Sequence, residues 1–163
     1  GIEKSATHYQ VDHWIRVNPT LDRWQQQTRT AAGEILFVEM HRKICVLSDI
    51  NSLTTFDAEH PEDCSKNLVI RTLRAITADL KKMLDEKAIG KIRNNRDGRN
   101  EIKGKCVSLI TENYLNNGYV EDFAADDVTV SCMGDAARDS VAVTVGVRVV
   151  DTMDKIYLTV VSE

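Results

Sequence analysis

The sequence from Ser140 to Asp151, SVAVTVGVRVVD, places a valine at every odd position from 141 to 149. Because side chains in a β-strand alternate between two faces, this pattern predicts a strand with one all-valine face. The opposite face carries Ala142, Thr144, Gly146 and Arg148, which are small or polar. A strand of this kind is typical of an antiparallel sheet that is covered on one side, and the remaining elements must supply that cover.

A second β-rich run, Lys155–Val161 (KIYLTVV), follows the turn-like segment Thr152-Met153-Asp154 and stands at the end of the sequence. Its two faces alternate as Ile156, Leu158 and Val160 against Tyr157, Thr159 and Val161. We therefore expect a second strand. An apolar strand with no following element to shield it promotes association unless another strand pairs with it. We take this strand as the main indication of function.

Composition indicates a soluble protein. The 163 residues are 42% hydrophobic and 28% charged, which suits one ordinary domain. A net charge of −4 argues against nucleic-acid binding, and the basic stretch Lys87–Arg99 is interrupted by acids and asparagines. No apolar run approaches the ~20 residues of a membrane span, and the beginning of the sequence lacks a signal-peptide pattern. We expect a cytosolic site of synthesis.

The four cysteines, Cys45, Cys64, Cys106 and Cys132, are scattered, and none forms a CxxC pair. Zinc binding is therefore disfavoured. Cys45 lies in a predicted strand and Cys106 on the apolar face of a predicted helix, so we expect buried thiols that pack as small hydrophobic groups.

Residues 1–33 are polar, and we interpret them as a connector or arm that is partly helical. A helix over Thr20–Ala32 would begin with Thr20 as its N-cap and stop at Gly33. The apolar runs Glu34–Met40 and Lys43–Ile50 follow, separated by His41-Arg42, and they predict a β-hairpin although the preferred Asn-Gly turn is absent.

Two helices are predicted in the middle of the chain. Ser65 is a suitable N-cap for a helix over Lys66–Ile89, in which apolar residues recur at alternating spacings of four and three up to Gly90. A second helix is expected over Gly98–Asn117, capped by Asp97 or its neighbour. A further β-run, Val128–Cys132, precedes the valine strand.

The resulting order is β-β-α-α-β-β-β. Hairpins outnumber alternating βα units, so we expect an α+β fold in which two main helices pack on one face of a largely antiparallel or mixed sheet. The terminal strand is then available for strand addition between subunits.

No motif indicates catalysis. The stretch Arg93–Gly104 has Gly98 at the sixth position of a calcium-binding loop, but Arg93 and Gly104 stand where carboxylates are needed. The sequence contains no glycine-rich phosphate loop, HExxH or GxSxG. The acidic pairs Glu121-Asp122 and Asp126-Asp127 could serve as general acid and base, but acids that flank a strand are usually solvated. We expect no enzymatic activity, no catalytic residues, no cofactor and no metal.

Four segments occur in order along the chain: Leu47–Phe56 (LSDINSLTTF), Cys64–Arg71 (CSKNLVIR), Ile89–Arg99 (IGKIRNNRDGR) and Val149–Val161 (VVDTMDKIYLTVV). Together they resemble the C-terminal region of contractile phage tail sheath proteins, of the type found in myoviruses and defective prophages of Gram-positive bacteria. Members of that family are usually much longer and carry further domains before this region. The resemblance covers residues 34–163, which we expect to form a tail sheath C-terminal-like domain.

The resemblance implies a structural subunit that stacks in rings around a tail tube and contracts to drive the tube through a cell envelope. Its partners would be copies of itself and the tail tube protein, without nucleic-acid binding or membrane insertion. It would belong to the virion tail and assemble in the cytoplasm of the bacterial host. The resemblance also implies that extended arms of neighbouring subunits add strands to the sheet of this domain.

We expect the subunit contacts in the last strand and in the Glu34–Ile50 hairpin, our choice of acceptor. The residues are Lys155, Ile156, Tyr157, Leu158, Thr159, Val160 and Val161, with Ile35, Phe37, Ile44 and Val46 on the acceptor. Two alternatives remain at this stage. In one, the chain is a non-enzymatic binding module whose last strand closes its own sheet; in the other, it is a small enzyme with a pocket of convergent polar groups.

Overall fold

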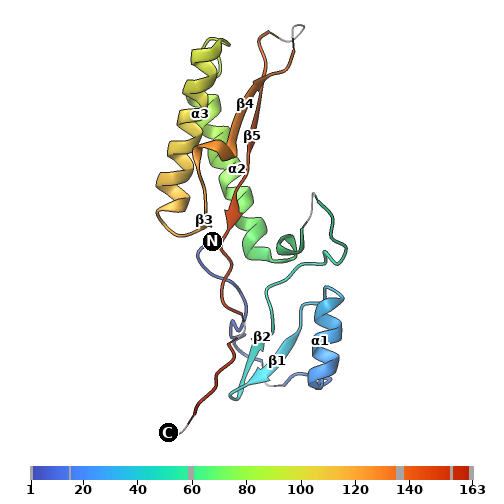
Figure 1. Ribbon diagram of the computed structural model, residues 1–163. Coiled ribbons are helices and arrows are strands. Elements are labelled where there is room, and N and C mark those ends of the chain that lie inside the picture. The colour runs from blue at the N-terminus through green and yellow to red at the C-terminus, as the bar shows by residue number, and fades with distance from the viewer. Residues whose placement is uncertain (1, 15, 59–60, 135–137, 155, 162–163) are drawn as a thin grey trace. The chain divides into compact units, whose positions relative to one another are not determined.

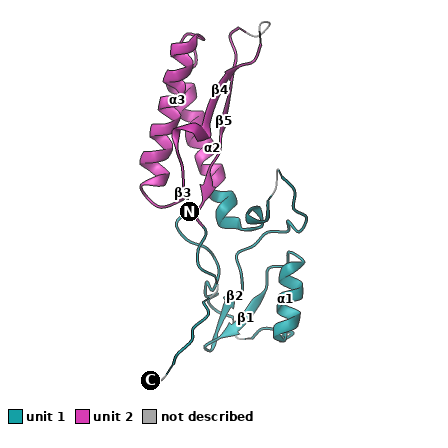
Figure 2. Ribbon diagram, in the orientation of Figure 1, with its two compact units in different colours: residues 1–71, 151–163 teal, residues 72–150 magenta. Residues whose placement is uncertain are grey.

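The computed structural model describes residues 2–14, 16–58, 61–134, 138–154 and 156–161 (Figure 1). The chain divides into two compact units (Figure 2). Unit 1 comprises Gly1–Arg71 and Asp151–Glu163, and unit 2 comprises Thr72–Val150. The predicted α+β class is confirmed. Among the described residues, the strands pair antiparallel in three separate two-stranded sheets instead of one larger sheet.

Unit 1 contains helix α1 (Arg23–Ala31) and the hairpin of strands β1 (Phe37–Met40) and β2 (Lys43–Val46). The predicted helix is present, but its predicted cap is wrong. Asp22 caps α1 in place of Thr20, because the Asp22 carboxylate accepts the Gln25 N–H at 2.8 Å while the Gln25 side chain accepts the Asp22 N–H at 3.0 Å. This reciprocal pair is a capping box.

The predicted β-hairpin is confirmed, with Phe37 opposite Val46 and Met40 opposite Lys43. The turn residues His41 and Arg42 have φ values of 51° and 64°. Positive φ at both central residues matches the type I′ geometry that suits the twist of a hairpin, here without the usual Asn-Gly pair.

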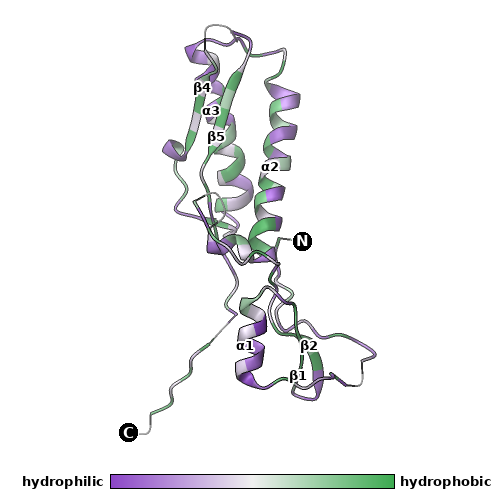
Figure 3. Ribbon diagram, turned by 90° about the vertical axis from the view of Figure 1, so that its right-hand side faces the viewer, coloured by the Kyte–Doolittle hydropathy of each residue, from purple (hydrophilic) through white to green (hydrophobic). Residues whose placement is uncertain are grey.

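Helix α2 (Asn67–Lys87) is the longest element of the chain, and its hydrophobic and polar stretches alternate along the ribbon (Figure 3). It begins one residue later than expected, and Ser65 is not its cap. Ser65 belongs to a short 3-10 helix, Glu62–Ser65, and Lys66 has extended backbone angles and forms a β-bridge with Ile50. Helical geometry therefore starts only at Asn67.

Unit 2 also contains α3 (Arg96–Ile110), which continues as one π-helical segment, Thr111–Leu115. The cap predicted at Asp97 or its neighbour is wrong, because the Asn95 side chain accepts the Gly98 N–H at 2.8 Å. The remaining strands are β3 (Val120–Glu121), β4 (Val128–Cys132), β5 (Val141–Val145) and β6 (Arg148–Val149), with a 3-10 turn at Ala125–Asp127.

The valine strand divides at Gly146. Residues before it, in β5, pair with β4, and residues after it, in β6, pair with β3. The Gly146 N–H donates instead to the Asp127 carbonyl at 2.9 Å. The predicted alternation survives this break, since the five odd-numbered valines are all partly buried. The sequence periodicity thus predicted the more buried face of the valine strand correctly, but it did not predict that the strand changes its pairing partner at Gly146.

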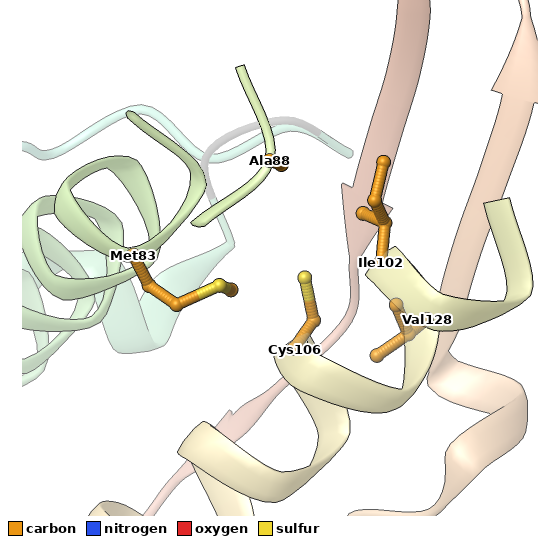
Figure 4. Packing of buried hydrophobic residues seen from close by; sticks show 5 residues of the cluster. All are labelled: Met83, Ala88, Ile102, Cys106 and Val128. Carbon is orange, nitrogen blue, oxygen red and sulfur yellow. The ribbon is translucent and has the colours of Figure 1, made fainter. Parts of the chain in front are cut away.

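The core of unit 2 lies between α2, α3 and β4 (Figure 4). It consists of Met83, Ala88, Ile102, Cys106 and Val128. Burial of the thiols is confirmed for three of the four cysteines, but Cys132 at the end of β4 is exposed.

Unit 1 is held together by a network around Asp49, whose side chain is 7% exposed. Its carboxylate accepts the Ala6 N–H at 2.9 Å, the Asn67 amide at 2.9 Å and the Arg71 guanidinium at 3.1 Å. The Asp49 N–H in turn donates to the Thr7 hydroxyl at 2.9 Å. We call these five residues the Asp49 network, which joins the beginning of the chain to the start of α2.

Burial alone would raise the pKa of Asp49, but the hydrogen bonds from Ala6, Asn67 and Arg71 and the charge of Arg71 outweigh it. The pKa of Asp49 therefore lies below its ordinary value of 3.8. A depressed carboxylate pKa stabilises the fold above the ordinary value, and this contribution is lost as the pH falls through the folded-state pKa.

We expect Asp49→Asn to lower the free energy of unfolding of unit 1 by about 2 kcal/mol, because charge-assisted hydrogen bonds are lost and Arg71 loses its ion-pair partner. Both tryptophans, Trp14 and Trp24, lie in unit 1, so their fluorescence during urea denaturation measures this unit. The stability of the variant should also fall less than that of the unchanged protein when the pH is lowered below ~4, because asparagine does not titrate.

The matched control in the same unit is Glu34→Gln, which removes an ion pair with Arg29 between exposed side chains. Such pairs contribute little, so its unfolding midpoint should stay close to that of the unchanged protein. Equal unfolding midpoints for Asp49→Asn and the unchanged protein would contradict the importance of the network.

A second prediction concerns Gly98, where an added Cβ would lie 2.0 Å from the Arg93 carbonyl oxygen. Gly98→Ala should destabilise unit 2 by about 1–3 kcal/mol, because the loop before α3 must move. Gly104→Ala is the control in the same helix, since a Cβ there meets nothing within 4 Å. It should stabilise by about 0.5–1 kcal/mol. Circular dichroism at 222 nm during urea denaturation measures both, and a reversed order would refute the packing argument.

Candidate subunit-interaction site

The segment Ile156–Val161 is apolar and almost fully exposed. Ile156 is 81% exposed, Leu158 83% and Val160 84%, and Tyr157 and Val161 on the alternate positions are 89% and 79% exposed. Thr159 is exposed as well, and Lys155 lies outside the described residues. Since a strand alternates its side chains between two faces, pairing would place apolar groups on both faces of this segment.

The strand predicted over Lys155–Val161 is absent from the described part of that segment. Residues 156–161 carry no helix or strand in the structure (Figure 1), and they make no backbone hydrogen bond to another described residue. The physical reason is that a strand is defined by its partner: β-forming side chains favour extended backbone, but only a neighbouring edge can satisfy the N–H and C=O groups.

In the predicted acceptor hairpin, the outer edge of β2 is already occupied. The His8 N–H donates to the Val46 carbonyl at 2.7 Å, the Val46 N–H to the Tyr9 carbonyl at 3.0 Å, and the Val11 N–H to the Ile44 carbonyl at 2.8 Å. Residues 8–11 of the same chain thus lie along β2. Ile44 and Val46, both predicted contacts, bond through their outward backbone groups within the chain.

The outer edge of β1 is different. Phe37 and Glu39 stand opposite Val46 and Ile44 in the register, so their backbone groups point outward on the other side of the hairpin. No backbone hydrogen bond from the described part of the chain reaches these outward groups. Ile35, just before β1, is 52% exposed. Of the two edges, β1 is therefore the one with unpaired groups.

The side chains beside this edge are aromatic as well as aliphatic. Trp14 contacts Phe37, with ring centroids 4.8 Å apart and planes inclined by 49°. Trp14 remains 52% exposed, and Tyr9, which lies along β2, is 67% exposed. Sequence reasoning missed residues 8–11 as parts of this hairpin, since the segment before residue 20 carries no alternating apolar pattern.

The acidic pairs weighed as catalytic groups lie in the solvent. Asp122 contacts the Arg148 guanidinium at 3.1 Å and Asp126 the Lys103 ammonium at 3.9 Å, and both carboxylates are highly exposed. Among the described residues, His, Cys, Asp and Glu form no cluster of three or more. Within the same residues, no helix has the length and apolarity needed to cross a membrane.

Comparison with known proteins places this geometry in a family. The model of the phage tail sheath C-terminal domain matches residues 59–163, more than half of the chain. The phage-like element PBSX protein XkdK of Bacillus subtilis is 30% identical over 168 residues, covering 96% of this chain and 35% of that protein. The tail sheath protein of Clostridium phage phiCD119 is 28% identical over 111 residues, covering 68% and 30%.

A solved structure agrees with the sequence relatives. The sheath tail protein of Desulfitobacterium hafniense superimposes with a TM-score of 0.77 at 29% identity, covering 96% of this chain and 36% of that one. The chain thus spans about a third of the length of the curated relatives it matches. The resemblance noted in the sequence is confirmed, and the chain belongs to the phage tail sheath C-terminal domain family.

Proposed function

We propose that the chain is the C-terminal part of a structural, non-enzymatic subunit of a contractile phage or phage-like tail sheath. Membership of the sheath family supports this role. Residues 34–163 act as the sheath C-terminal-like domain, and residues 1–33 act as a connector. The partners are further copies of the subunit and a tail tube protein, in a virion tail that assembles in the bacterial cytoplasm.

The proposed mechanism rests on two observations, an exposed apolar segment and a strand edge with unpaired backbone groups. Ile156–Val161 is an exposed apolar segment without a partner among the described residues, and the outer edge of β1 has unpaired backbone groups. We propose that the segment of one subunit adds to the β1 edge of another. Such strand addition satisfies backbone groups by hydrogen bonding, while alternate side chains fill the acceptor surface.

The free energies of burial and association indicate that a single strand joint is weak and that many joints are needed for a stable assembly. Burying three to five apolar side chains at ~1.5–3 kcal/mol each stabilises a joint by at most roughly 5–15 kcal/mol, comparable with the ~4–15 kcal/mol cost of association. One joint is marginal, and repetition through closed and stacked rings makes it strong. Flexible joints of this kind can persist while other subunit contacts change, so contraction needs no cofactor and releases free energy stored during assembly.

The alternative, in which the last strand closes the chain's own sheet, requires pairing of 156–161 with a described edge. The high exposure of its five large apolar side chains argues against that alternative. A small enzyme is disfavoured because the acidic groups considered for catalysis are solvated.

Deletion of Lys155–Glu163 tests the donor. Because the described residues 156–161 contact little else, the melting temperature should change by less than about 2 °C. The truncated chain should remain monomeric in sedimentation velocity at concentrations where the full chain associates. A truncated chain that unfolds would support the alternative, and one that associates normally would refute donation.

A second experiment tests the acceptor edge. A fluorescent peptide with the sequence of residues 155–163 is titrated with the truncated chain, and anisotropy is measured. Glu39→Pro, which removes the outward N–H of β1, should weaken peptide binding at least about tenfold. Glu39→Thr keeps that N–H and should bind like the unchanged edge. Equal binding to both variants would place the acceptor elsewhere.

A further inference from the structure

The base of the exposed segment is attached to the domain by charge. The Lys66 ammonium forms an ion pair and hydrogen bond with the Asp154 carboxylate and lies 3.7 Å from Asp151 Oδ2. These side chains are partly buried, at 27% exposed for Lys66, 34% for Asp151 and 14% for Asp154. All three belong to unit 1. We call this contact the Lys66 anchor.

Lys66 is itself held rigidly. Its backbone bridges to Ile50, its N–H donates to the Asp63 carbonyl at 3.1 Å, and its carbonyl accepts the Ile70 N–H at 3.2 Å. The neighbouring Ser65 carbonyl accepts the Asn51 N–H at 2.8 Å. The ammonium therefore projects from a backbone whose position is determined on both sides.

The partner segment is short and locally ordered. The Thr152 N–H donates to the Asp151 carboxylate at 2.8 Å, and the Thr152 hydroxyl contacts Asp154 Oδ1 at 3.3 Å. Residues 152–154 also line a shallow hollow together with Glu3–Ser5 and Thr7-His8. Two residues beyond Asp154, Ile156 is 81% exposed. The carboxylate that Lys66 holds thus lies two residues before the exposed apolar segment.

The charges of the anchor reinforce each other. Burial would lower the pKa of Lys66, but the hydrogen bond and charge of Asp154 and the charge of Asp151 outweigh it, so this pKa lies above its ordinary value of 10.5. A raised lysine pKa means that the stabilisation is fully present below the ordinary value and lost only as the pH rises through the folded-state pKa. The ammonium therefore stays charged throughout the neutral range.

We propose that Lys66 is a positioning residue, which holds Asp151–Asp154 so that Ile156–Val161 leaves the domain in one direction for pairing with a second copy. This inference rests on the proposed function. Its physical basis is pre-organisation: a segment whose base is fixed loses less conformational freedom on binding than one whose base moves. Two segments that carried the sequence resemblance, Cys64–Arg71 and Val149–Val161, meet in this anchor.

The experiment compares Lys66→Met with Lys82→Met, which removes an exposed lysine from α2. Steady-state ¹⁵N–{¹H} NOE measurements follow the amides of Thr152 and Met153. Association is measured by anisotropy between the full-length chain and an acceptor lacking residues 155–163, labelled at the exposed Cys132. Urea denaturation followed by tryptophan fluorescence reports the stability of unit 1.

In Lys66→Met, we expect the NOE values of Thr152 and Met153 to fall to those of Tyr157, with little change in the urea midpoint. Association with the acceptor should weaken about tenfold, as expected when the competent orientation falls to about a tenth of the population. Lys66→Arg, or the charge exchange Lys66→Asp with Asp154→Lys, should restore most of the loss. Lys82→Met should behave like the unchanged chain.

Three outcomes would overturn the proposal. Unchanged NOE values would show that Lys66 does not hold the segment. A urea midpoint that falls in parallel with association would show a merely structural role. Mobile amides with unchanged association would show that the anchor does not guide pairing. If removal of residues 155–163 from the donor also left association unchanged, strand donation itself would fail.

Discussion

The Asp49 carboxylate is the interaction on which the organisation of unit 1 depends. It binds residues up to 43 positions away along the chain, and it follows the hairpin and lies beside the first turn of α2. By holding Ala6 and Thr7, it leads residues 8–11 onto the outer edge of β2. A buried carboxylate of this kind is stable only with its full set of donors, so the arrangement of the three segments is strongly specified.

Because the β2 edge is already paired, the two edges of the hairpin differ in their capacity to bind another strand. Exposed strand edges invite pairing, and here one edge is closed by the chain's own residues 8–11 while the β1 edge keeps outward groups at Phe37 and Glu39. The Lys66 anchor holds Asp154, two residues before the exposed apolar segment Ile156–Val161. The region around the start of α2 takes part in both contacts. Lys66 binds Asp154, and Asn67 and Arg71 bind Asp49.

Much of the fold could be predicted, because it rests on local periodicity. The hairpin around His41-Arg42, the buried face of α2, the strand Val128–Cys132 and the partly buried odd-numbered valines all follow from residue spacing. Caps were less predictable, since Asp22, Asn95 and the extended Lys66 each compete with an equally plausible neighbour. Of the candidate site, the exposed apolar segment was found from sequence, whereas Tyr9 and Lys66 were not.

The sequence by itself determined which stretches could be helices or strands and that the apolar run Ile156–Val161 would need a partner, because these properties follow from side-chain alternation along neighbouring residues. Only the tertiary structure decided which edge of the hairpin is closed, where the valine strand changes partner, and what holds the base of the last segment. The ion pair between Lys66 and Asp154 joins residues 88 positions apart. No local pattern records such a contact, since it exists only when folding brings two otherwise ordinary charges together out of water.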